Sequence, residues 1–99
     1  MNIKKVPEDD KLTIVLEGRL DTTTASEFQD VLIPAFDEAN KIVLDFSGIA
    51  YVSSAGLRVL LIGEKEAKAR GASMSLTAIS EDVMEVFEMT GFSDMLSIV

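Results

Sequence analysis

Residues 41–46, Lys41-Ile42-Val43-Leu44-Asp45-Phe46, form a nearly continuous apolar run. Such a run is typical of a strand covered on both faces in a mostly parallel sheet, so we expect it to be the central strand. An amphipathic helix is predicted from Gly56 to a stop at Gly71, and residues 73–77 alternate as a strand does. Strand, helix and strand in this order predict a βαβ unit with a right-handed crossover, which restricts the chain to the α/β class.

The segments before this unit predict a hairpin and a helix. Residues 3–6 and 12–17 flank the turn-forming segment 7–10, a pattern typical of two antiparallel strands. A helix is expected to begin near Ala25, because Thr24 and Glu27 have the spacing of a capping box. Pro34 removes a helical hydrogen bond and clashes with the preceding turn, so we predict a kink or break near Leu32 and Ile33.

The segments after residue 46 complete the predicted fold. Ser47-Gly48 is interpreted as a turn with Asp45 as its capping carboxylate, and residues 49–52 lead to the next helix. Ser80 is the expected N-cap of a third helix that ends at Gly91, and residues 95–99 predict a last short strand. We therefore predict one α/β domain over residues 1–99, with a mixed β-sheet and helices packed mainly on one face.

Composition excludes several classes of function. The chain has no histidine and no cysteine, which removes Ser-His-Asp catalysis, the usual zinc sites and disulfides. We predict no enzyme, no catalytic residue, no metal site and no cofactor. A net charge of -8 argues against nucleic acid and anionic membranes and favours a basic protein partner. No apolar run approaches the ~20 residues that span a bilayer, and the N-terminus does not resemble a signal peptide, so we expect a soluble, cytoplasmic protein.

The stretch Tyr51–Leu61 is the strongest candidate for a functional surface. It places two hydroxyls and two small residues between an apolar strand and an apolar helix, so either Ser53 or Ser54 can serve as N-cap. A helix start carries unpaired N–H groups and the positive end of the macrodipole, so a phosphate on a serine there is favourably placed. The alternative interpretation is a plain serine cap.

Two charged residues have a functional and a structural interpretation each. Asp21 follows the second strand and is expected at the same sheet edge as Ser54, or it caps the turn formed by Thr22 and Thr23. Arg58 lies one turn into the helix, within reach of a phosphate on Ser54, or it is a solvated surface arginine.

The whole chain resembles the STAS domain family, and within it the small bacterial anti-sigma factor antagonists. Four segments carry the resemblance, and they occur in the family's order: Gly18–Asp21, Ile42–Gly48, Tyr51–Leu61 and Val86–Phe92. The family motif is usually Asp-Ser-Ser/Thr-Gly-Leu, phosphorylated on the serine directly after the aspartate. Matching Gly56-Leu57 to its Gly-Leu places Ser54 at the phospho-acceptor, Ala55 at the Ser/Thr and Ser53 at the aspartate, where the sequence departs from the family.

The resemblance implies a phosphorylation switch. In such a switch the unphosphorylated protein binds an anti-sigma factor that is also a serine kinase and thereby releases the sigma factor. Phosphorylation inactivates the antagonist, and a PP2C-type phosphatase resets it. The implied alternative is a phosphate-independent STAS adaptor or an accessory subunit of a transport or signalling complex. The residues expected at the partner surface are Asp21, Thr22, Thr23, Ser53, Ala55, Gly56, Leu57 and Arg58.

Overall fold

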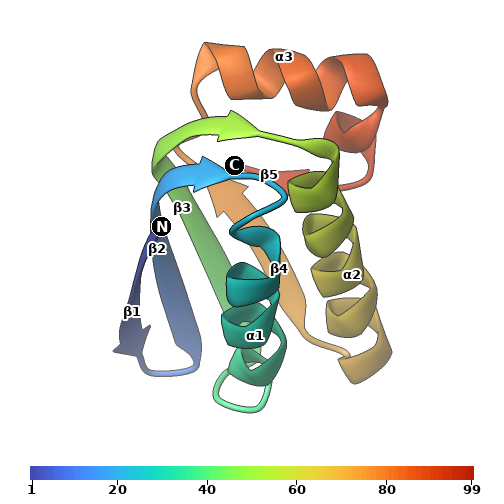
Figure 1. The fold of residues 1–99 in the computed structure, drawn as a ribbon. Helices are drawn as coiled ribbons and strands as arrows, with labels where there is room; N and C mark the ends of the chain where they lie inside the picture. Colours follow the sequence, from blue (N-terminus) through green and yellow to red (C-terminus); the bar gives the residue numbers. More distant parts are fainter.

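The five strands of the protein form one mixed sheet in the order β1-β2-β3-β4-β5, in a computed structural model that describes residues 1–99 (Figure 1). β1 (Asn2–Glu8) pairs antiparallel with β2 (Lys11–Leu20), which confirms the predicted hairpin. β3 (Lys41–Val52), β4 (Ser73–Thr77) and β5 (Ser97–Ile98) continue the sheet in parallel. The predicted α/β class and mixed sheet are confirmed.

The connections between the parallel strands carry the helices α1 (Ala25–Ala35), α2 (Ser54–Arg70) and α3 (Glu81–Thr90), and the 3-10 turn η1 (Phe92–Asp94) precedes β5. Each connection leads to the next strand in the same direction across the sheet. Right-handed crossovers that advance in one direction place their helices on the same face. Figure 1 shows α1 and α2 side by side on one face, with α3 across the end of the sheet. Helices packed mainly on one face were predicted, and the structure confirms this.

The core lies between the sheet and α1 and α2. Leu44 of β3 and Leu60 of α2 are fully buried there, together with Phe28 of α1. β3 is the central strand, as predicted, but the expectation that both of its faces are covered is wrong. Val43 and Asp45 point to the other face and are only half-buried, because the helices cover one face alone.

Three of the predicted helix caps, at Gly71, Ser80 and Gly91, are confirmed in the structure. Gly71 and Gly91 adopt the left-handed conformation that ends a helix, and the Ser80 hydroxyl accepts a hydrogen bond from the backbone N–H of Val83 at 3.3 Å. The capping box at Thr24 is wrong. Its side chain makes no cap hydrogen bond and instead donates to a backbone carbonyl of β2, so it is used to shape the loop before α1.

Pro34 does not break α1 near Leu32 and Ile33, which corrects the prediction. The helix continues through Pro34 and ends one residue later, at Ala35. In the last turn, proline removes a single helical hydrogen bond. The chain then tightens, since the N–H of Phe36 donates to the carbonyl of Ile33 at 3.3 Å.

The predicted turn at Ser47-Gly48 is also wrong, because β3 continues through it to Val52. Two shifts of the register against β2 insert extra residues into β3, which is the geometry of β-bulges. The Asp45 carboxylate accepts a hydrogen bond from the N–H of Ser47 at 2.9 Å, so it does cap locally, within a strand. Because β3 continues to Val52, its last residue lies beside Leu20, the last residue of β2.

Glu64 of α2 is an exception in the core. The residue is 9% exposed, and its Oε2 atom is buried without a hydrogen-bond partner. A buried acceptor without a partner is destabilising, so we expect Glu64→Met to raise the free energy of unfolding by about 1–2 kcal/mol, measured by urea denaturation. Glu66→Met is the matched control: Glu66 accepts from Arg70 at 2.6 Å, and its loss is expected to be slightly destabilising. Equal effects of the two changes would contradict the prediction.

Candidate partner-binding site at the start of α2

The site begins where β2 and β3 end side by side. Leu20 pairs with Val52 in the sheet, and the N–H of Ser53 donates to the Leu20 carbonyl at 2.9 Å. A Cβ atom on Gly56 would lie 2.7 Å from Leu20 Cγ and 2.9 Å from its carbonyl oxygen. Only glycine permits this close approach, which holds the first turn of α2 against the end of β2. The loop that begins at Asp21 and the start of α2 therefore form one surface.

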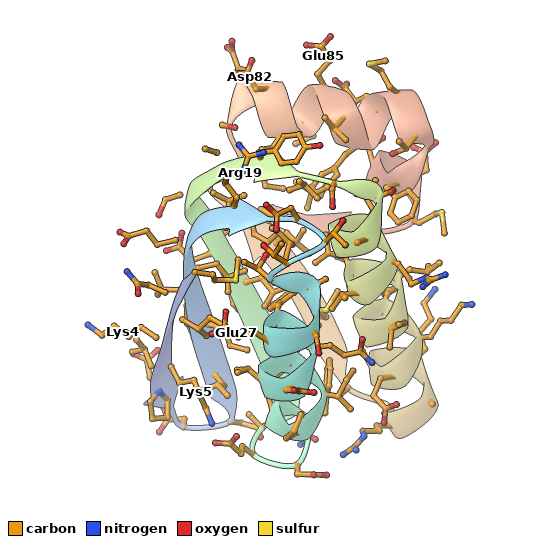
Figure 2. The ribbon with its side chains drawn as sticks, in the orientation of Figure 1. Lys4, Lys5, Arg19, Glu27, Asp82 and Glu85 are labelled. Atoms are coloured by element: carbon orange, nitrogen blue, oxygen red, sulfur yellow. The ribbon has the colours of Figure 1, made fainter.

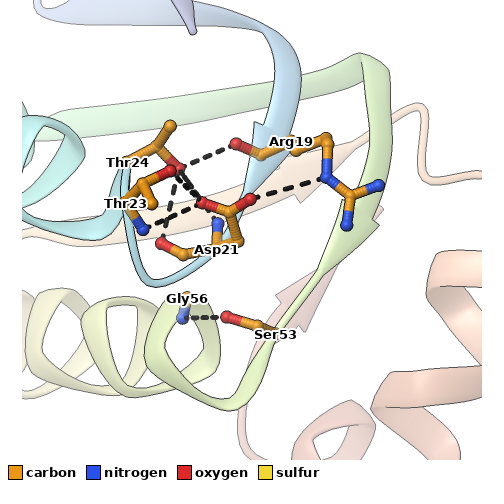
Figure 3. A network of polar contacts seen from close by, with 6 residues as sticks. All are labelled: Arg19, Asp21, Thr23, Thr24, Ser53 and Gly56. Atoms are coloured by element: carbon orange, nitrogen blue, oxygen red, sulfur yellow. Dashed lines mark hydrogen bonds and ion pairs between the residues drawn. The ribbon is translucent and has the colours of Figure 1, made fainter.

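The structure decides between the two serines as cap. The hydroxyl of Ser53 accepts a hydrogen bond from the N–H of Gly56 at 3.4 Å, so Ser53 is the N-cap of α2 (Figure 3). Ser54 is the first residue of the helix and is exposed, and its hydroxyl makes no hydrogen bond. That hydroxyl is available for modification, beside the unpaired N–H groups and the positive end of the helix dipole.

Asp21 organises the loop that precedes α1 (Figure 3). Its Oδ1 atom accepts from the N–H of Thr23 at 3.0 Å and from the Thr23 hydroxyl at 2.7 Å. The Thr24 hydroxyl donates to the carbonyl of Arg19 at 2.7 Å and accepts from the N–H of Asp21 at 2.9 Å. Asp21 therefore caps the turn, which confirms the structural interpretation. The turn lies at the sheet edge where α2 begins.

The hydrogen bonds to Asp21 predict its response to pH. The Thr23 hydroxyl, above all, holds the pKa of the Asp21 carboxyl below its usual range; the N–H of Thr23 and the Arg19 side chain act in the same direction, and desolvation opposes them. A carboxyl with a lowered pKa stabilises the fold above its unfolded pKa, and this contribution is lost as the pH falls through the folded pKa. In an NMR titration, Thr23→Val is expected to raise the pKa of Asp21. Thr22→Val, at an exposed neighbour, is expected to leave it unchanged.

The sequence did not predict the contact between Arg19 and Tyr51 at this surface. The Arg19 guanidinium lies 4.3 Å from the centre of the Tyr51 ring, and Arg19 Nε is 3.5 Å from Asp21 Oδ2. The ring fixes an arginine beside the Asp21 loop. Arg19 and Tyr51 are paired across β2 and β3 only because of the bulges in β3, which set the register. The exposed tyrosine in the Tyr51–Leu61 stretch was the one available signal.

The other predicted residues differ in exposure. Thr22 and Arg58 are exposed, and Arg58 makes no ion pair. Ala55 is half-buried. Gly56 and Leu57 are buried, with Leu57 6% exposed. These last two residues position the first turn of α2 by packing and present no side chain to a partner in this fold.

Comparison with known proteins agrees with the fold. The profile of the STAS domain family matches residues 1–99, and the chain belongs to this family. The anti-sigma-B factor antagonist of Staphylococcus epidermidis is 25% identical over 99 residues, which cover 99% of this chain and 92% of that protein. BtrV of Bordetella bronchiseptica, whose assignment as an anti-sigma factor antagonist is itself provisional, is 33% identical over 85% of this chain and 73% of its own length.

SpoIIAA, an anti-sigma factor antagonist of Bacillus, is a solved structure with a similar fold. Its unphosphorylated form superposes with a TM-score of 0.82 at 19% identity, over 99% of this chain and 88% of that chain. Its phosphorylated form gives a TM-score of 0.75 at 18% identity, over 99% and 91%. At this identity the likeness concerns the fold.

None of the helices combines the length and apolar character that a membrane span requires.

Proposed function

We propose that this chain is an anti-sigma factor antagonist controlled by phosphorylation of Ser54. The unphosphorylated form binds an anti-sigma factor that is also a serine kinase, and this binding releases the sigma factor. Phosphorylation of Ser54 by that kinase ends the interaction, and a PP2C-type phosphatase restores it. The chain acts as ligand and substrate, and ATP is bound by the kinase.

The observation that carries the proposal is the placement of the two serines. Ser53 is occupied as the cap of α2, whereas the Ser54 hydroxyl is exposed and free of hydrogen bonds beside the Asp21 loop. The family match and the relatives named anti-sigma factor antagonists support the same role. SpoIIAA, which has this fold, exists in a phosphorylated form.

The chemistry of the surface suits a switch. A phosphate on Ser54 adds about −1.5 to −2 charges and a hydration shell to a contact surface of small residues. The positive end of α2 stabilises that charge locally, and Arg58, one turn further along the helix, is placed to meet it. The phosphorylated protein therefore remains folded while its docking surface changes.

Intact mass after incubation with ATP and a lysate of the source organism tests the proposal. The wild type is expected to gain one phosphoryl group, and Ser54→Ala none. Ser53→Asp is the matched control: it removes the neighbouring hydroxyl, restores the family's aspartate and keeps a good N-cap. We expect it to be phosphorylated. Phosphorylation of Ser54→Ala but not of Ser53→Asp would show that Ser53 is the phospho-acceptor.

A second candidate is a phosphate-independent STAS adaptor, or an accessory subunit of a larger complex. The observation in its favour is Ser53, which stands where the family motif usually has aspartate. If neither the wild type nor Ser53→Asp gains mass while the kinase is active on another substrate, the adaptor is favoured.

A further inference from the structure

The solvent side of α2 carries a row of positive charge on an acidic protein. Ser54, Arg58, Leu61, Lys65 and Lys68 fall within a sector of about 80° around the helix axis, since successive residues are about 100° apart. Gly63, whose Cβ would meet Leu32 of α1 and Met74 of β4, lies on the opposite side. The row, which we call the α2 stripe, therefore faces away from the core. In Figure 2, nitrogen-tipped side chains extend from the side of α2 that is remote from α1.

The cations of the α2 stripe are not neutralised within the chain. Arg58, Lys65 and Lys68 are exposed and form none of the ion pairs, which use Lys5, Lys11, Arg19 and Arg70. Both acids of α2 lie outside the stripe. Glu66 is paired with Arg70, and Glu64 is buried. Leu61, half-buried at its centre, adds an apolar contact.

We infer that the α2 stripe is a docking surface for an acidic face of the anti-sigma factor kinase, continuing the contact at Ser54 along the helix for about 21 Å. The inference rests on the proposed function and names the chemistry of the partner. Complementary charge is the argument for the occupant: three unpaired cations without an interspersed acid attract carboxylates and speed association. The overall charge of -8 favours a basic partner, but this face favours an acidic one.

The same arrangement couples docking to phosphorylation. Ser54 lies at one end of the α2 stripe, and Arg58 is the cation nearest to it along the helix. A phosphate at Ser54 engages Arg58 and lowers the positive charge that the stripe offers. Lys65 and Lys68 lie about three to four turns from Ser54 and contribute to capture of the kinase without touching the phosphorylated group.

The test is the initial rate of Ser54 phosphorylation, followed by intact mass in ATP-supplemented lysate of the source organism with the antagonist at low concentration. Lys65→Gln/Lys68→Gln is expected to lower the rate about fivefold or more at low salt, and the difference is expected to disappear at 0.5 M salt. Lys4→Gln/Lys41→Gln removes the same charge from two exposed, unpaired lysines on the sheet face without helices. This control is expected to react at the wild-type rate, and circular dichroism checks that both variants are folded.

Each outcome separates the inference from the proposed function. Equal rates for the α2 stripe variant and the wild type overturn the inference and leave the switch intact. If both double variants lose the same fraction of the wild-type rate, the effect comes from net charge alone. That result also overturns the inference. Absence of phosphate on the wild type refutes the switch itself, and the inference is refuted with it.

Discussion

Ser54→Asp is expected to weaken binding of the anti-sigma factor kinase about a hundredfold or more, measured by titration calorimetry with the purified kinase. The exposed hydroxyl lies in a surface of small residues, and a carboxylate there must lose hydration when a partner covers it. A loss of ~3 kcal/mol of binding free energy corresponds to more than a hundredfold in Kd. An acidic residue in the first turn of α2 is favourable for the helix, so the protein remains folded.

Ser54→Asn is the matched control for this prediction. Asparagine has the size of aspartate without its charge, and we expect its Kd to stay within about fivefold of the wild type. Binding of Ser54→Asp with wild-type affinity would contradict the switch and support the adaptor. Equal losses in the Asp and Asn variants would assign the effect to size rather than charge.

Gly56→Ala is expected to lower the free energy of unfolding by about 3 kcal/mol, or the Tm by about 12–24 °C. The added Cβ would lie 2.7 Å from Leu20 Cγ and 2.9 Å from the Leu20 carbonyl oxygen. That oxygen also accepts from the N–H of Ser53, so it cannot move without opening the junction of β2 and α2. Thermal denaturation followed by circular dichroism measures the change.

Gly63→Ala provides the comparison within the same helix. Its Cβ would lie 2.7 Å from Leu32 Cδ2 and 2.9 Å from Met74 Sδ, which are ends of flexible side chains. Rotation of these ends relieves much of the overlap, and alanine is the better helix former by about 1 kcal/mol. We expect a change in stability smaller than about 1 kcal/mol. A loss as large as that of Gly56→Ala would show that the Leu20 backbone is not the deciding contact.

Local signals in the sequence predicted most of the elements. The hairpin, the βαβ unit, the start of α1 at Ala25, the cap at Ser80 and the stops at Gly71 and Gly91 all depend on a few neighbouring residues, and the structure confirms them. The errors occur where distant contacts outweigh a local preference. The Thr24 hydroxyl binds the backbone of Arg19 instead of capping α1, and the pairing of β3 with β2 continues through Ser47-Gly48.

The sequence by itself determined the α/β class, the parallel centre of the sheet and a serine pair at the start of a helix, because these follow from periodicity and capping over short distances. Only the tertiary structure decided that Ser53 is the cap and Ser54 is free, and that Leu57 is buried while Arg58 is exposed. The physical reason is the register of β3. Its bulges bring Val52 beside Leu20 and Tyr51 beside Arg19, so the Asp21 loop and the start of α2 meet through contacts between residues some 30 positions apart.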